Sequence, residues 1–168
     1  ARLTGFTNSI DLGHFGAIAK DNRPVLHIHS YGKQLPGDLK WRGSALSRFD
    51  GRRWSEPPIS SDIVPAEARV PVADIWQLSR VNGERMLYRV DVSNSGAGTL
   101  FVAGVPEYFY LGAPSLIRTA DDSFRANTLP GEPIGYEVSA WRGTPLPYPL
   151  SVADRRRNLP LPPLDRRI

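Results

Sequence analysis

A strand-like run that ends in a tight turn decides the fold, and it reads Lys40-Trp41-Arg42-Gly43-Ser44-Ala45-Leu46-Ser47-Arg48-Phe49-Asp50-Gly51-Arg52-Arg53-Trp54. Residues 39–48 predict one β-strand. Asp50-Gly51 predicts a two-residue turn, because glycine adopts positive φ at no steric cost. A strand that reverses through such a turn indicates an antiparallel hairpin. We expect Trp41 and Trp54 to be cross-strand neighbours that pack together.

Short strand-like segments continue on both sides of this stretch. In residues 25–31 the side chains alternate with period two, which places His27 and His29 on one strand face. Asn82-Gly83 predicts a type I′ hairpin turn between strands at 74–80 and 85–92. Further strands are predicted at residues 100–103, 108–111, 116–119, 123–126 and 135–141, with a turn at Asp121-Asp122. About nine short strands without alternating helices predict an all-β fold, either an antiparallel β-sandwich or a barrel-like domain.

Residues 1–22 differ from the rest and predict a short N-terminal helix. Asp11 can cap this helix, and the apolar residues that recur at helical spacing are Leu12, Phe15 and Ile18 or Ala19. Gly13 and Gly16 lower its intrinsic stability by about 1 kcal/mol each relative to alanine. We therefore expect a helix that is held mainly by packing.

Two proline-rich segments complete the domain organisation. Residues 55–72 predict a long connection that runs over the surface. Residues 142–168 are rich in proline and arginine, and they predict an extended linker or a strap along the domain, leading toward a catalytic core outside this chain. The β core is expected at residues 23–141, and the whole chain, 1–168, is expected to form one domain.

Composition excludes several classes of function. The 168 residues contain no cysteine, so the chain itself holds no disulfide, thiolate zinc site or cysteine nucleophile. Residues 151–168 carry five arginines and two aspartates, which gives +3 of the net charge of +4. The body is therefore nearly neutral and lacks the basic face that nucleic-acid binding requires. No apolar run reaches the roughly 20 residues that span a bilayer, and the start at Ala1 shows no signal peptide, so we expect a piece of a longer protein.

The order of motifs resembles a known family. Trp41-Arg42-Gly43, followed by Leu46, Phe49-Asp50-Gly51 and Trp54, is similar to the extracytoplasmic segment ahead of the catalytic core in bacterial membrane-anchored transglutaminase-like proteins of the TgpA type. The resemblance continues in the same order along the chain, except at about residues 67–85, in segments 6–13, 25–28, 89–92, 99–103, 136–140 and 158–168.

This resemblance implies a parent protein with N-terminal membrane helices, this domain outside the cytoplasm (periplasmic or at the cell surface), and a following core with a Cys-His-Asp triad. No catalytic residue carries over, because the chain has no cysteine. The candidate interaction or structural motif consists of Trp41, Arg42, Gly43, Phe49, Asp50, Gly51 and Trp54. No cofactor is predicted, and the oligomeric state is not indicated.

Other candidate sites have a simpler structural interpretation. His27 and His29 have a spacing that can bind zinc or copper, but a third ligand is needed and His14 is the one further histidine. Two polar residues on a solvated face are the simpler interpretation. Trp41, Trp54, Trp76 and Trp141 can stack on carbohydrate or anchor a core or an interdomain contact. Four arginines lie near the turn, namely Arg42, Arg48, Arg52 and Arg53. They can bind an anionic polymer or simply form a solvated face.

Two functional hypotheses follow. The first is a non-catalytic accessory domain that connects the membrane anchor of a transglutaminase-like protein to its core and positions that core. The second is a binding module for a cell-wall glycan or an extended peptide, which would use exposed aromatic side chains or an unpaired strand edge. Exposed tryptophans in a groove would favour the second. A third hypothesis, an independent hydrolase, has little support, because the sequence shows no nucleophile–base arrangement.

Overall fold

The structure is a computed structural model that describes residues 9–11, 26–56, 62–65, 69–73, 78, 81–93, 98–119, 121–129, 132–145, 151–152 and 155–156. These residues contain fourteen strands, namely β1 (Ser9–Asp11), β2 (Leu26–Ser30), β3 (Trp41–Arg42), β4 (Arg48–Phe49), β5 (Arg53–Ser55), β6 (Asp62–Pro65), β7 (Val70–Pro71), β8 (Val81–Val92), β9 (Thr99–Leu100), β10 (Val102–Ala103), β11 (Val105–Leu111), β12 (Ser115–Arg118), β13 (Phe124–Ala126) and β14 (Ile134–Pro145). The prediction of an all-β fold is confirmed. Within these ranges no helix is long and apolar enough to cross a membrane.

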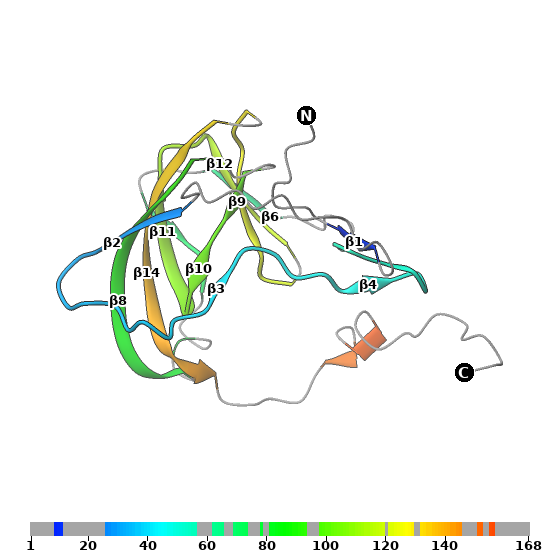
Figure 1. Cartoon of the computed structure of the whole chain (residues 1–168), viewed down its shortest axis with the longest axis horizontal. Helices are drawn as coiled ribbons and strands as arrows, with labels where there is room; N and C mark the ends of the chain where they lie inside the picture. Colours follow the sequence, from blue (N-terminus) through cyan, green and yellow to red (C-terminus); the bar gives the residue numbers. More distant parts are fainter. Residues whose placement is uncertain are drawn as a thin grey trace.

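The strands form four sheets, and every pair among the described strands is antiparallel. A five-stranded sheet has the order β2-β8-β14-β11-β7, and a four-stranded sheet has the order β6-β12-β13-β9. A three-stranded sheet, β1-β5-β4, lies to one side of them (Figure 1), and β10 pairs with β3. None of these sheets closes on itself in the described part of the chain, so the barrel-like alternative is not formed.

One hydrophobic core is shared by the two larger sheets. The Phe109 ring on β11 lies 4.9 Å from Phe124 on β13 and 6.2 Å from Tyr136 on β14, measured between ring centroids. Residues on β8 alternate as the strand period requires: the buried residues are Met86, Tyr88, Val90 and Val92, and Arg85, Leu87, Arg89 and Asp91 lie on the opposite face. The five-stranded sheet therefore has an apolar inner face and a polar outer face.

Two buried tyrosines fix the chain where it passes between the sheets. The Tyr88 hydroxyl donates to the carbonyl oxygen of Ala103 and accepts from its backbone N–H, both at 2.9 Å. The Tyr136 hydroxyl makes the same pair of bonds with Phe101, at 2.9 and 2.6 Å. Burial raises the pKa of both phenols well above the ordinary value, which keeps them protonated.

The predicted Asn82-Gly83 hairpin is wrong, because β8 runs without a break through both residues. Gly83 pairs with Gly143 on β14, and a Cβ atom at residue 83 would collide with the carbonyl oxygen of Arg142. Glycine is required here by the close approach of two backbones and not by a turn. The first arm of the predicted hairpin, residues 74–80, lies almost entirely outside the described residues.

Other boundaries also differ from the predictions. The strand expected at 39–48 is interrupted, since β3 and β4 are separated by residues 43–47. The connection at 55–72 contains two strands, β6 and β7, which pair with β12 and β11. β14 extends to Pro145, so the first residues of the expected linker belong to the sheet.

Asp11 is the last residue of β1 and not a helix cap. The rest of the expected N-terminal helix, residues 12–22, lies outside the described residues.

Candidate functional site

The block from Trp41 to Trp54 is divided between two sheets. Trp41 on β3 is paired with Ala103, and its ring packs edge-to-face on Tyr88 with centroids 5.1 Å apart. Trp54 lies on β5, where its register partner is Phe49 on β4, and the two rings stack at 4.9 Å. The prediction that Trp41 and Trp54 pack together is therefore wrong: Trp41 packs on the core and Trp54 does not.

The predicted turn at Asp50-Gly51 is confirmed. Gly51 has a φ of 100°, and the Asp50 carboxylate accepts hydrogen bonds from the backbone N–H groups of Arg52 and Arg53, at 2.9 and 2.7 Å. These backbone bonds lower the pKa of Asp50. The carboxylate therefore holds the turn between β4 and β5 in place.

The three-stranded sheet presents an apolar row, which we define as Ile10, Trp54 and Phe49. These residues are direct cross-strand partners on β1, β5 and β4, so their side chains share one face. Ile10 is 55% exposed and Trp54 is 38% exposed. Large apolar side chains gathered on an exposed face mark an interaction surface more often than isolated ones do.

Three interactions attach segment 42–56, which carries Phe49 and Trp54, to β13 and to the turn between β12 and β13. The Arg42 guanidinium donates to the carbonyl oxygen of Asp122 (2.8 Å), and the backbone N–H of Ala45 donates to the Ser123 hydroxyl (2.9 Å). Glu56, just after β5, forms an ion pair with Arg125 on β13, and both side chains are only 11% exposed. Burial lowers the pKa of the Arg125 guanidinium. Segment 42–56 is thus fixed to the body by both polar and ionic bonds.

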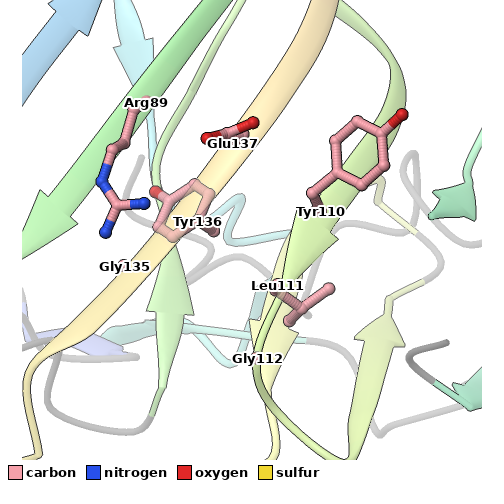
Figure 2. Close-up of a pocket in the computed structure, with 7 residues that line it drawn as sticks. All are labelled: Arg89, Tyr110, Leu111, Gly112, Gly135, Tyr136 and Glu137. Carbon is pink, nitrogen blue, oxygen red and sulfur yellow. The ribbon is translucent and has the colours of Figure 1, made fainter. Parts of the chain in front are cut away.

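A second candidate site lies on the outer face of the five-stranded sheet. A shallow hollow of about 340 Å³ opens there, and its lining includes Arg89, Tyr110, Gly112, Gly135 and Glu137. Figure 2 shows the Glu137 carboxylate between the Arg89 guanidinium on β8 and the Tyr110 ring on β11. No local motif predicts this site, because its side chains are brought together by the register of three strands.

Hydrogen bonds within this face fix its charged groups. The Arg89 guanidinium donates to the Asp91 carboxylate at 2.8 to 3.1 Å, and these bonds raise the pKa of Arg89. The Tyr31 hydroxyl donates to Glu137 at 2.8 Å, which raises the pKa of Tyr31. The hollow is therefore bounded by an ion pair on one side and a carboxylate–phenol pair on another.

The remaining predicted residues are placed as follows. His27 and His29 are exposed on β2, opposite Asp91 and Arg89, and no group of three or more potential ligands suitable for a metal occurs among the described residues. Trp141 is half-buried on β14, and Trp76 and His14 lie outside the described residues.

The arginines near the turn do not form one patch. Arg53 is paired with Asp11 at 2.6 Å, and Arg42 is bonded to a backbone carbonyl. Arg48 and Arg52 are exposed. Two of the four guanidinium groups therefore already have partners within the domain. This weakens the interpretation of these arginines as a binding site for an anionic polymer.

Comparison with known proteins agrees with the order of motifs. A family model described as the TgpA N-terminal domain matches residues 1–147. The crystal structure of the periplasmic domain of TgpA from Pseudomonas aeruginosa matches with a TM-score of 0.58 and 21% identity, covering 83% of this chain and 44% of that chain. The same domain bound to ethylmercury matches with a TM-score of 0.58 and 22% identity, covering 82% of this chain and 44% of that chain. This chain thus spans less than half the length of the solved chains. No match was found among the curated proteins.

Proposed function

We propose that this chain, which belongs to the family of TgpA N-terminal domains, is a non-catalytic accessory domain of a transglutaminase-like membrane protein. In this role it connects the membrane anchor to a cysteine-dependent core on the same polypeptide and positions that core outside the cytoplasm. The periplasmic origin of the solved relatives supports the location. The chain has no cysteine, so the thiolate of such a core would lie in another part of the parent protein.

The observation that carries this proposal is the apolar row of Ile10, Trp54 and Phe49. Exposed tryptophan is typical of the residues that contribute most to protein–protein binding. The row lies on a small sheet whose strands pair only with each other among the described residues. The anchors at Arg42, Ala45 and Glu56 hold this sheet against the body. A fixed apolar surface of this kind suits contact with a neighbouring domain.

The occupant that fits is the catalytic core of the same polypeptide. Three apolar side chains bury too little surface to hold a free partner tightly. A neighbouring part of the same chain needs less contact, because the connecting segment keeps it at a high effective concentration. The solved relatives are more than twice as long as the part of them that this chain matches, which leaves room for such a core.

Calorimetric titration of this domain with the separately expressed core of the parent protein tests the proposal. Weak but saturable binding is expected at concentrations up to about 1 mM, because the connecting segment that raises the effective concentration is absent from this experiment. Ile10→Ser and Trp54→Ser should each weaken binding by about tenfold or more, because each removes apolar contact area. Ile63→Ser is the matched control, since Ile63 is also an exposed strand isoleucine (65%) but lies on β6, in the four-stranded sheet.

Two results would contradict the positioning role. One is the absence of binding even at about 1 mM while the core alone is folded and fully active. The other is binding that Ile63→Ser weakens and that Ile10→Ser leaves unchanged, which would move the contact to the four-stranded sheet.

A further inference from the structure

We propose that the outer face of the five-stranded sheet binds a linear, uncharged oligosaccharide, with one sugar ring seated in the hollow that Arg89, Tyr110, Gly135 and Glu137 line. The site lies on a different sheet from the apolar row and does not depend on the role proposed above.

Four functional side chains form a line across the sheet. His29 on β2 is the register partner of Arg89 on β8, Arg89 is the partner of Glu137 on β14, and Glu137 is the partner of Tyr110 on β11. Direct partners lie on the same face. Neighbouring strands are about 4.8 Å apart, so the four groups extend over about 14 Å. The distance of about 4.8 Å between neighbouring strands is close to the length of one pyranose ring. A linear glycan laid across the strands would therefore meet one side chain per ring.

Gly135, in the adjacent row, leaves room for the ion pair of Arg89 and Asp91 to lie directly over β14. Gly135 is the register partner of Asp91 on β8, which in turn is paired with His27 on β2. A Cβ atom at residue 135 would lie 2.5 Å from the Arg89 Nη2 and 2.7 Å from the Asp91 Oδ1. Since this space is occupied by the ion pair, an added methyl group would push the Arg89 guanidinium out of its place at the side of the hollow, where Figure 2 shows it next to Gly135.

The chemistry of this face suits hydroxyl groups better than charged ligands. Arg89 is paired with Asp91, and nearby Arg85 is paired with Glu107 at 2.8 Å, so the cations already have anionic partners. An anionic polymer would have to displace these carboxylates. A carboxylate has about four lone-pair sites and a guanidinium has five N–H donors. Glu137 and Arg89 therefore keep capacity to accept from and donate to sugar hydroxyls.

Aromatic side chains flank the polar groups, as sugar binding requires. Tyr110 lies at one end of the row and packs edge-to-face on Tyr108, with centroids 5.2 Å apart. Tyr31, which is 40% exposed, packs edge-to-face on His29 at 5.3 Å. Exposed aromatic rings stack on the C–H faces of sugars. None of the described tryptophans lines this hollow, so tyrosine rings would supply the stacking surface.

An extended peptide fits this surface less well. Peptides that bind sheets add a strand to a free edge, where the main chain offers unpaired N–H and C=O groups. The proposed row crosses the face of the sheet, where β8 and β14 are paired on both sides. A face of this kind offers side chains and no free backbone groups, which favours the glycan.

A titration of the 15N-labelled domain with the β-1,4-linked tetramer of N-acetylglucosamine, followed by NMR, tests the proposal. We expect saturable shifts at residues 89, 110, 135 and 137. Gly135→Ala should weaken binding by about tenfold or more, which corresponds to the loss of one or two hydrogen bonds. This variant should fold, because the added methyl group meets only the ends of two flexible side chains.

Gly37→Ala is the matched control, since a Cβ atom there meets nothing within 4 Å and the residue does not line the hollow. Glu137→Gln provides a second probe: it keeps the side-chain shape, and weaker binding is expected because the carboxylate is the stronger acceptor. The proposal is overturned if the tetramer causes no saturable shifts, or if Gly135→Ala and Gly37→Ala bind it equally. It is also overturned if a hexa-alanine peptide produces the shifts and the sugar does not.

Discussion

At the scale of single residues, the buried phenol of Tyr88 gives a direct test of the core. Tyr88→Phe removes the group that both accepts from and donates to the backbone of Ala103, which is fully buried. We expect the free energy of unfolding to fall by about 1–3 kcal/mol, the cost of leaving a buried polar group without its partner. Urea denaturation measures it. Tyr110→Phe on the outer face is the control and should change stability little.

The same substitution also changes the dependence of stability on pH. Burial raises the pKa of Tyr88 in the folded state above the unfolded value of about 10. The stabilisation is therefore fully present below pH of about 10 and is lost as pH rises toward the folded-state pKa, by up to about 1.4 kcal/mol per pH unit for each such phenol. Between about pH 10 and 12, Tyr88→Phe should lose stability less steeply than the wild type. Equal slopes would contradict the burial of this hydroxyl.

At the scale of elements, Gly83 accounts for the largest difference between sequence and structure. The dipeptide Asn82-Gly83 is a strong local turn signal, but the pairing of Gly83 with Gly143 keeps β8 and β14 continuous. Gly83→Ala should lower the free energy of unfolding by about 3 kcal/mol, because a Cβ atom would collide with the backbone at Arg142. Gly37→Ala is the control and should shift it by less than about 0.5 kcal/mol. Thermal unfolding of the two variants gives the comparison, and equal stability would show that residue 83 lies in a turn.

The contrast between the local turn signal at Gly83 and its long-range pairing shows which elements could be predicted from sequence. Strands with clear alternation, such as residues 85–92, were predicted correctly because the pattern is local and one face is buried. The strand at 62–65 was missed because proline dominates its neighbourhood, although an edge strand tolerates proline where no ladder N–H is needed. Local signals do not report the long-range pairing that decides between a turn and a strand.

The candidate sites were likewise predictable only where a local signal determines them. The Asp50-Gly51 turn was predicted because one glycine and one carboxylate determine it within four residues. The hollow on the five-stranded sheet was not predicted, since Arg89, Glu137 and Tyr110 are far apart in sequence and meet only through register. Only Trp54 of the Trp41–Trp54 pair proved to lie on an exposed surface, because β3 and β5, which carry the two residues, join different sheets.

At the scale of the whole molecule, the buried pair of Glu56 and Arg125 decides how firmly the three-stranded sheet is held. Arg125→Met removes one partner and leaves the Glu56 carboxylate buried without its countercharge, which costs about 3 kcal/mol. Because β1, β4 and β5 pair only with each other among the described strands, this sheet should detach while the larger sheets persist. Amide hydrogen exchange in β4 and β5 should speed up on the order of a hundredfold, whereas exchange in β8 and β14 should change little.

A matched pair of variants separates this effect from a general loss of charge. Lys33→Met breaks the exposed ion pair between Lys33 and Glu84 and should leave exchange unchanged throughout, since such surface pairs contribute little. Replacing both buried partners, as Arg125→Met with Glu56→Leu, should restore most of the protection, because no uncompensated charge remains. If Arg125→Met instead speeds exchange equally in all sheets, the three-stranded sheet unfolds together with the core, and the apolar row is part of one cooperative unit.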